Sequence, residues 1–293
     1  MCRWMAYTGA PITVDALISK PDHSLIHQSL NARQLALPGV SFARQFPGHD
    51  FPTQGEGYGV AWVGRDGNLG HIRDTVPAWD SQNLVHLVSQ IESPCFLAHV
   101  RAAPGGSLST DNNHPFVHDG WMFQHNGGVG DFLKLKRDLV MDVDPSLYPF
   151  IDGNTDSETL FYLSLTYGLA NDPAGALRRM HDRVQQARLD HGVTAAFTGT
   201  FAASDGEQIF TMRVVSEEGL AKGDQAEAPT LYYATGPFEI TAGDGPKIQI
   251  PQHAHVIASE PAELHYSPRT WREIENLTIG QFRVGEEPLF TTL

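Results

Sequence analysis

The sequence predicts an α+β protein in which antiparallel sheets are covered by helices, and two observations carry that prediction. Hairpin signals recur along the chain, at Asp66-Gly67 and at Asp205-Gly206, each between stretches of strand-forming residues. The helical segments are grouped, so strands and helices do not alternate as they do around a parallel, doubly wound sheet. No change in composition divides the chain, and we therefore expect residues 1–293 to form a single domain.

The first half of the chain is expected to be mainly strand. The first hairpin joins expected strands at residues 58–63 and 69–74. A helix is expected after the capping candidates Asp80 and Ser81, because residues 84, 87, 88 and 91 are apolar at helical spacing. Residues 95–102 form a short apolar run typical of a buried strand. Residues 121–124 predict another strand, which runs into the turn signal HNGG at residues 125–128.

The second half begins with helices and ends with strands. Thr155 and Glu158 have the spacing of a capping box ahead of the apolar stretch at residues 159–169. Residues 174–190 predict a second, longer helix that ends at Gly192. Strands are expected at residues 194–203, 208–215, 231–235 and 254–259. Loops that place side chains are expected at residues 111–114 (DNNH) and 153–156 (GNTD), and a further loop at residues 219–229.

The composition argues against several functional classes. A formal net charge of −14 disfavours binding to nucleic acid or to anionic lipid. No apolar run approaches the roughly 18 residues of a membrane span, and the start lacks the features of a signal peptide. The two cysteines, Cys2 and Cys95, are too few for a disulfide framework, so we expect free thiols in a cytoplasmic setting. We expect Cys95, within its apolar run, to be buried and inert.

No sequence motif indicates a metal site or a cofactor. The chain has neither an HExxH motif nor paired CxxC motifs. His253 and His255 would point to the same face of a strand, which leaves them as the one metal candidate. We favour a packed or surface role for both, and we expect no metal and no cofactor.

Cys2 stands at a position where a purely structural role is difficult. A residue at a chain end frays unless the fold ties it down. Removal of Met1 would leave the Cys2 thiol and a free α-amine on the same residue. An α-amine has a pKa of roughly 7.7–8.0, which suits a general base for a neighbouring nucleophile. The alternative is a cysteine at a frayed end with no function.

Three further positions along the chain, which we call stations, carry groups suited to bind a substrate that has one positive and one negative charge. Arg101 ends an apolar strand and can bind a carboxylate with two hydrogen bonds, or form an ordinary surface ion pair. Asn126 and the N–H of Gly127 can donate to a developing oxyanion, or form a simple hairpin turn. Asp156 can bind an ammonium group, or merely complement the dipole of the helix that it begins.

Taken in order, the N-terminal Cys, HxRxA at residues 99–103, HNG at residues 125–127 and TDSE at residues 155–158 resemble the class II glutamine amidotransferases. These are N-terminal nucleophile hydrolases. The chain is also similar to the stand-alone branch of this family, which includes YafJ-type proteins and the amidohydrolase of ergothioneine biosynthesis. This similarity lies in the segments MCRWMAYTGAPI, PDHSLIHQSLNAR, PAWDSQNL, NNHPF and VIASEP. The resemblance covers roughly residues 1–271. It implies a four-layer αββα sandwich with two antiparallel sheets.

The resemblance also implies a role for each station. Cys2 would attack the γ-amide carbon of glutamine or of a γ-glutamyl amide and form a thioester, while its α-amine moves the proton. Asn126 and the N–H of Gly127 would form the oxyanion hole. Arg101 would hold the α-carboxylate of the glutamyl group, and Asp156 its α-ammonium.

Two histidines are expected to lie beside the site, and two other residues near it differ from the family pattern. His99 and His125 flank the stations, and we assign them to the support of the site, His125 on its substrate-binding side. Pro104 stands where the family commonly has Thr or Ser, which affects carboxylate recognition. Glu56 stands where relatives tend to have Asp, and its longer side chain affects the pocket.

Three functions remain open from the sequence. We favour hydrolysis of a small γ-glutamyl compound, because nothing in the chain itself uses ammonia. One alternative is a glutaminase subunit that hands ammonia to a separate synthase, and a homo-oligomer is possible in either case. The other alternative is a non-catalytic protein that binds glutamyl groups, which Pro104 and a retained Met1 would favour.

Overall fold

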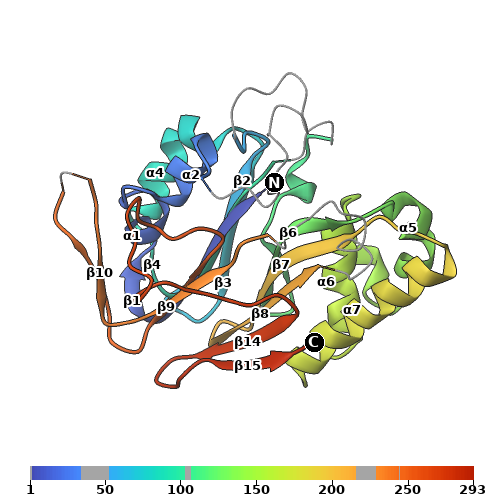
Figure 1. Cartoon of the computed structure of the whole chain (residues 1–293). Coiled ribbons are helices and arrows are strands. Elements are labelled where there is room, and N and C mark those ends of the chain that lie inside the picture. The colour runs from blue at the N-terminus through green and yellow to red at the C-terminus, as the bar shows by residue number, and fades with distance from the viewer. Residues whose placement is uncertain (1, 34–52, 103–106, 216–228, 244) are drawn as a thin grey trace.

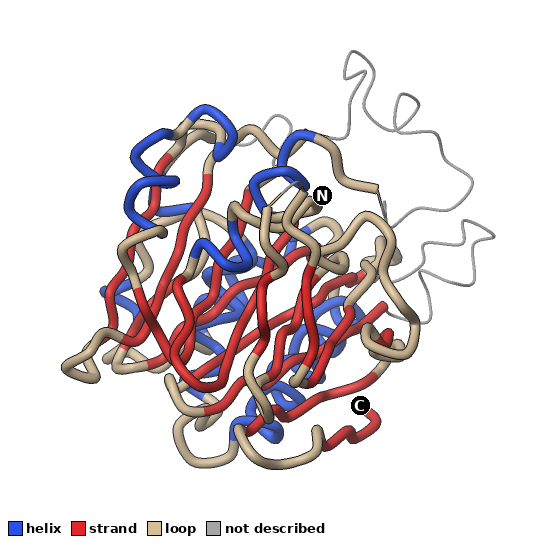
Figure 2. Tube along the Cα trace, turned by 90° about the vertical axis from the view of Figure 1, so that its left-hand side faces the viewer, coloured by secondary structure: helices blue, strands red, loops and turns tan. Residues whose placement is uncertain are grey.

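Two antiparallel sheets lie face to face at the centre of the molecule, and helices cover their outer faces (Figures 1 and 2). The structure is a computed structural model that describes residues 2–33, 53–102, 107–215, 229–243 and 245–293. One sheet has the strand order β13-β9-β12-β1-β4-β2-β3, and the other β15-β14-β8-β7-β6-β5. The four layers are those that the resemblance implies, so the predicted fold class is confirmed.

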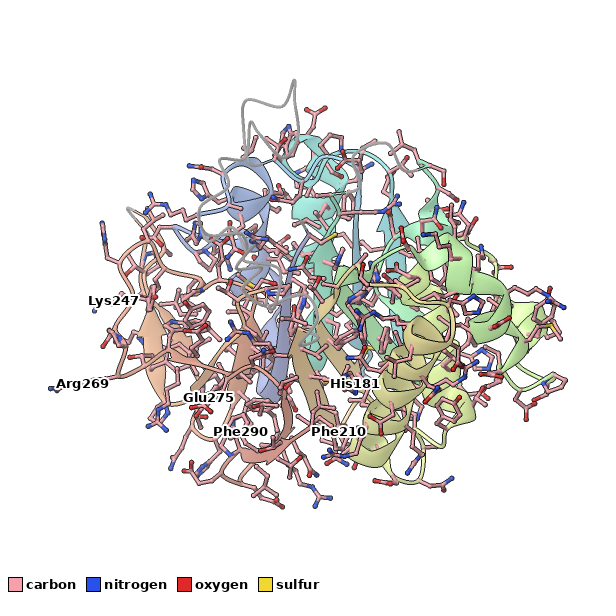
Figure 3. The ribbon with its side chains drawn as sticks, turned by 45° about the vertical axis from the view of Figure 1, so that its right-hand side comes forward. His181, Phe210, Lys247, Arg269, Glu275 and Phe290 are labelled. Carbon is pink, nitrogen blue, oxygen red and sulfur yellow. The ribbon has the colours of Figure 1, made fainter. Side chains whose placement is uncertain are left out.

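The first sheet consists of β1 (Arg3–Thr13), β2 (Tyr58–Val63), β3 (Leu69–Asp74), β4 (Glu92–Val100), β9 (Tyr232–Thr235), β12 (His255–Ala258) and β13 (Arg272–Glu273). The second sheet consists of β5 (Phe116–His118), β6 (Trp121–Val129), β7 (Phe197–Ser204), β8 (Gln208–Val215), β14 (Thr278–Arg283) and β15 (Leu289–Thr292). A separate hairpin, β10 (Phe238–Ile240) and β11 (Ile248–Ile250), stands beside the first sheet. Lys247 of this hairpin points away from the body of the molecule (Figure 3).

The outer layers are two groups of helices. The first sheet is covered by α1 (Asp15–Ile18), α2 (Leu25–Leu30) and α4 (Gln82–Val88), and the second by α5 (Phe132–Met141), α6 (Asp156–Thr166) and α7 (Pro173–Asp190). Among the described residues, no helix has both the length and the apolar character needed to cross a membrane.

Strand β1 runs through the middle of the first sheet and is buried on both faces. Its side chains alternate, as strand geometry requires. Met5 and Tyr7 pack under the helices, whereas Trp4 and Ala6 pack between the two sheets. Because both faces are buried, the segment shows no alternation of polar and apolar residues, and the sequence pattern did not predict this strand.

Helix α6 begins with half of the expected capping box. The side chain of Thr155 accepts a hydrogen bond from the N–H of Glu158 at 3.3 Å. The carboxylate of Glu158 does not return to the N-cap, as in a full box, but binds the N–H groups of Asp152 and Gly153 at 3.0 and 2.8 Å. The helix start therefore also fixes the expected loop at residues 153–156.

The HNGG segment is part of a strand, and its interpretation as a turn is wrong. Strand β6 continues to Val129, with Asn126 opposite Thr200 and Gly127 opposite Gly199 of β7. Gly127 has φ +149°, and a Cβ there would lie 2.1 Å from the carbonyl oxygen of Thr198. The glycine serves a close approach between strands and not a chain reversal.

Other local predictions need smaller corrections. The cap of α4 is Ser81, which accepts from the N–H of Leu84 at 3.2 Å, while Asp80 belongs to a short 3₁₀ turn. His253 lies in a turn with φ 63° before β12, so His253 and His255 do not share a strand face. The strand expected from residue 194 begins at Phe197. Pro104 and most of the expected loop at residues 219–229 lie outside the described residues.

Candidate active site

Cys2 is tied to the end of strand β4. The next residue, Arg3, pairs with Val100 of β4. The N–H of Ala102 lies 3.3 Å from the Cys2 sulfur, and the carbonyl oxygen of Ala102 lies 3.5 Å from it. The thiol is only partly buried. The sulfur is thus fixed beside the residue that follows Arg101, and the sequence alternative of a frayed end is excluded.

Arg101 is a buried cation without a carboxylate partner among the described residues. Its side chain is 5% exposed. The guanidinium donates to the carbonyl oxygen of Ser107 at 3.1 Å and to Oδ1 of Asn113 at 3.5 Å, both neutral groups. Burial lowers the pKa of Arg101, while the nearby Cys2 and Glu56 act to raise it. A buried cation held only by neutral acceptors is suited to bind an anionic ligand.

Glu56 lies directly beside Arg101. Its N–H donates to the Arg101 carbonyl oxygen at 3.2 Å, and the N–H of Arg101 donates to the carbonyl oxygen of Gly57 at 2.8 Å. Within the part of the chain that the structure describes, the Glu56 Oε2 atom is buried and has no hydrogen-bond partner. The departure from the family pattern therefore places the longer carboxyl side chain of Glu56 next to Arg101.

Asn126 and Gly127 lie on a section of β6 whose outer edge is not covered by β5, which pairs only with residues 121–123. The N–H of Val129 points to this edge, because it donates to Oδ2 of Asp156 at 2.8 Å. Strand alternation turns the N–H of Gly127 to the same edge. The Asn126 side chain is 2% exposed, and its Oδ1 has no partner among the described residues.

Asp156 joins the start of α6 to the end of β6. Its Oδ2 accepts from Val129, and its Oδ1 accepts from the N–H of Ser157 at 2.8 Å. A Cβ built on Gly128 would lie 3.5 Å from Oδ2, so the carboxylate stands directly over that glycine. Oδ1 also accepts from Oγ of Ser157 at 3.4 Å, whereas Oδ2 keeps a second lone pair with which the carboxylate can accept from an ammonium group.

The buried histidines support the site from within. His125 Nδ1 is 2.9 Å from Oγ of Ser157, and its ring stacks on Phe201 with centroids 4.2 Å apart. His99 Nε2 donates to the carbonyl oxygen of His125 at 3.2 Å. Burial lowers the pKa of His125 and lowers that of His99 to about 3, so both rings are neutral at neutral pH. These contacts agree with a supporting role.

Side-chain contacts bring the two sheets together at this end of the sandwich. The indole N–H of Trp4 donates to Oγ1 of Thr200, the residue opposite Asn126, at 3.1 Å. The His99 contact with His125 joins β4 to β6. The ends of β1, β4 and β6 therefore lie at one site, which brings together the stations singled out in the sequence.

The sequence analysis missed the amide network that connects Arg101 to the loop before Asp156. Asn113 accepts from Arg101, and Asn112 Nδ2 donates to Oγ of Ser107 at 3.0 Å. The N–H of Asn154 donates to Oδ1 of Asn112 at 3.0 Å. The DNNH loop was the available signal, but nothing in its sequence indicates which atoms the amides bind.

We expect the free energy of unfolding to fall as the pH is lowered from about 6.5 to about 4. Burial lowers the pKa of His99 to about 3 and the pKa of His114 well below its ordinary value. Both histidines stay neutral in the folded protein, whereas the unfolded chain takes up protons below about pH 6.5. Each such histidine therefore removes about 1.4 kcal/mol of stability per pH unit in this window.

Urea unfolding across this pH window measures the slope. In His114→Phe, the slope of unfolding free energy against pH should decrease by about one proton, because the variant lacks this titrating ring. Phenylalanine should fit the position, since neither ring nitrogen of His114 has a hydrogen-bond partner among the described residues. The matched control is His86→Asn, at an exposed position of α4. A slope in His114→Phe equal to that of the wild type would contradict the assignment.

Comparison with known proteins identifies the family. The family model "Glutamine amidotransferases class-II" matches residues 30–224. A probable glutamine amidotransferase of Saccharomyces cerevisiae, DUG3, is 30% identical over 289 residues, which cover 89% of this chain and 76% of that protein. A γ-glutamyl-hercynylcysteine sulfoxide hydrolase of Mycolicibacterium smegmatis is 28% identical over 130 residues, 44% of this chain and 52% of that protein.

Solved structures agree with this assignment. A glutamine aminotransferase class-II domain protein from Silicibacter pomeroyi superposes with a TM-score of 0.67 at 26% identity, over 99% of both chains. The glutamine phosphoribosylpyrophosphate amidotransferase of Bacillus subtilis superposes with a TM-score of 0.56 at 16% identity, over 99% of this chain and 49% of that one. The second similarity concerns the fold alone.

Two facing antiparallel sheets between helices, with polar groups where β1 begins and where β4 and β6 end, form the N-terminal nucleophile fold, and together with the family match they define an amidohydrolase. The chain belongs to the class II glutamine amidotransferases.

Proposed function

We propose that this amidohydrolase cleaves the γ-amide bond of small γ-glutamyl compounds through a thioester on Cys2. One observation carries the proposal: the Cys2 sulfur lies 3.3 Å from the N–H of Ala102, directly after a buried arginine that has no carboxylate partner among the described residues. The nucleophile Cys2 contacts the residue that follows Arg101, so the thiol and the anion site lie close together in space. This arrangement suits a substrate with a carboxylate near its reactive carbonyl group.

The reaction has two halves that share the same groups. The sulfur attacks the γ-carbonyl carbon, and its proton passes to the α-amine of Cys2, which requires prior removal of Met1. The oxyanion accepts from the Asn126 amide and the N–H of Gly127. The C–N bond then breaks as the α-amine protonates the leaving amine. Water hydrolyses the thioester, releasing glutamate and restoring the thiol.

The glutamyl group provides one anion and one cation for the two charged residues of the site. Arg101 would hold the α-carboxylate, and Asp156 the α-ammonium, at the end of β6. Burial keeps His99 and His125 neutral at neutral pH, so neither ring competes with Arg101 for the carboxylate. One of the relatives acts on a γ-glutamyl compound by its name, which favours a substrate of that class here.

A panel of amides tests the proposal. Purified protein, shown by intact mass to lack Met1, is incubated with glutamine, γ-glutamyl-amino acids and γ-glutamyl-alkylamines, and glutamate is measured. We expect higher kcat/KM for γ-glutamyl compounds than for glutamine. A marked preference for glutamine would favour the alternative in which ammonia passes to a separate synthase. Absence of glutamate release from every amide would refute the proposal.

Asn126→Ala should lower kcat by about 100-fold or more and change KM little, because its amide donates to charge that exists only in the transition state. Steady-state kinetics on the best γ-glutamyl substrate measures the effect. The matched control is Asn68→Ala in the exposed turn between β2 and β3, where, within the part of the chain that the structure describes, the Asn68 side-chain amide donates only to Oδ2 of Asp66, at 2.7 Å. A normal kcat in Asn126→Ala would assign the oxyanion hole to another donor.

A further inference from the structure

Two sequence segments, MCRW at the start and VIASEP at residues 256–261, meet in the structure although the reaction assigns a role only to Cys2. Glu260 is 1% exposed and lies directly after β12. Its Oε1 accepts from Arg3 Nε at 2.6 Å, and its Oε2 lies 2.9 Å from His23 Nε2. The same Oε2 accepts from the N–H of Arg33 at 2.9 Å. One carboxylate thus connects three segments that are distant in the sequence.

The connection continues to Cys2 itself. Arg3 Nη1 donates to the carbonyl oxygen of Cys2 at 2.8 Å. Ser259 holds the following residue from the same side, since its Oγ accepts from the N–H of Trp4 at 3.1 Å and its own N–H donates to the Trp4 carbonyl oxygen at 2.9 Å. Residues 259–260, which we call the clamp, therefore hold the first two residues of β1 through both backbone and side chain.

The Glu260 carboxyl of the clamp is ionised at neutral pH. Burial raises the pKa of Glu260, but the charge of Arg3 and the hydrogen bonds from His23 and Arg33 outweigh it and lower the pKa to about 2. Burying an ion pair is costly, and replacing one by apolar residues often leaves stability unchanged or improves it. Stability alone is therefore a weak reason to keep this pair beside the nucleophile, whereas the fixed direction of the Arg3 guanidinium is a geometric reason.

We propose that Glu260 is a positioning residue for the reaction at Cys2, acting through Arg3 to fix the Cys2 carbonyl and so to aim the α-amine and the thiol. This inference rests on the proposed function of Cys2. The backbone of Cys2 is held on one side by Arg3, and its sulfur on the other by Ala102. Rotation about Cys2 would move the amine away from the thiol proton and the leaving group, and a displacement of about 1 Å can cost about 100-fold in rate.

Two substitutions separate charge from geometry. Glu260→Gln removes the charge and leaves one acceptor oxygen. Arg3→Lys keeps the buried positive charge for Glu260. The lysine lacks the planar guanidinium, so its single ammonium group cannot bind both Glu260 and the Cys2 carbonyl oxygen in the same geometry. The matched control is Glu273→Gln, which breaks the Arg213 to Glu273 pair (2.7 Å) on the edge strand β13. Glu273 lines a cavity with Glu275 and Phe290, the two residues that Figure 3 labels there. Intact mass confirms Met1 removal in every variant, since residue 3 adjoins the cleavage point.

Kinetics and thiol chemistry give independent readouts. With a γ-glutamyl substrate, we expect both variants to lose about 10- to 100-fold in kcat with KM within about twofold, while Glu273→Gln keeps the wild-type kcat. The rate of Cys2 alkylation by iodoacetamide should fall about tenfold, because the α-amine no longer takes up the thiol proton efficiently. Cys95 is 1% exposed, so the reagent reports on Cys2.

The outcomes separate this inference from the proposed function. Unchanged kcat and alkylation rate in Arg3→Lys would overturn the positioning role, and this holds even where Glu260→Gln fails to fold. A rise in KM with normal kcat would overturn it as well. Should the wild type hydrolyse no γ-glutamyl amide, the proposed function fails, and the alkylation rates alone decide whether the clamp positions Cys2.

Discussion

Cys2→Ala is expected to lose at least about 10³-fold in kcat for the release of glutamate from γ-glutamyl amides, because no other group can form the thioester. The reason is chemical and not structural. Among the described residues, the Cys2 sulfur hydrogen-bonds only with the backbone of Ala102, and the residue is only partly buried, so its removal leaves no large cavity in the core. We therefore expect the unfolding midpoint in urea to stay close to that of the wild type.

The chain offers a matched control in its second cysteine. Cys95 is buried between the sheets beside Oγ of Ser204 (3.3 Å), and burial raises the pKa of its thiol to about 12. Cys95→Ser should keep the activity of the wild type. Rapid quench and intact mass should also detect a glutamyl adduct on the wild type and none on Cys2→Ala. Equal turnover by Cys2→Ala and the wild type would remove Cys2 from the mechanism.

Arg101→Ala is expected to raise KM for γ-glutamyl substrates by about 10- to 150-fold, since a charge-assisted hydrogen bond is worth about 1.5–3 kcal/mol. The effect should depend on the substrate carboxylate. With 4-aminobutanamide, which is glutamine without its α-carboxylate, wild type and Arg101→Ala should have nearly equal kcat/KM. This comparison distinguishes a lost contact from a general disturbance of the site.

A second buried arginine controls for the loss of packing. Arg188 on α7 is 2% exposed and donates to the carbonyl oxygen of Ala195 at 3.0 Å, and the proposed reaction gives it no role. Arg188→Ala should lower stability and leave KM unchanged. An unchanged KM in Arg101→Ala, or an equal loss of kcat/KM for both substrates, would show that Arg101 does not bind the carboxylate.

Short-range signals predicted the elements that have clear local patterns, whereas β5, β10, β11, β13, β14, β15, α1 and α2 were not predicted. The strands β2 and β3 begin and end where the Asp66-Gly67 turn and its flanking residues predict, and Thr155 caps α6 as its spacing to Glu158 indicates. These elements depend on residues within a few positions of one another. Alternation and capping are local properties, so the sequence contains them directly.

Long-range contacts explain what the local patterns missed. Strand β1 was not predicted because both of its faces are buried, and α5 was missed because Asp131, at its N-cap position, has a left-handed conformation and makes no side-chain cap. The HNGG segment was interpreted as a turn for a similar reason, because the sequence does not show that Gly127 pairs with Gly199 of a neighbouring strand. A glycine next to Asn indicates a turn locally, and only the partner strand shows that it serves close packing.

The candidate site was predicted from the order of motifs, whereas its supporting contacts were not. The sequence singled out Cys2, Arg101, Asn126, Gly127 and Asp156, and the structure gathers the strand and helix ends that carry them. The clamp and the amide network join residues more than 200 and about 40 positions apart, as in the Arg3 to Glu260 and Asn112 to Asn154 contacts. No single-sequence pattern specifies such partners.

The seating of Cys2 has a practical consequence for anyone who produces the protein. With Arg3 and Trp4 held by the clamp and the sulfur held at Ala102, residue 2 has little freedom to turn outward. A purification tag fused ahead of it would occupy as an amide the amine that the proposed mechanism needs free. Expression vectors should therefore carry their tags after residue 293, or place a protease site that leaves cysteine as the first residue.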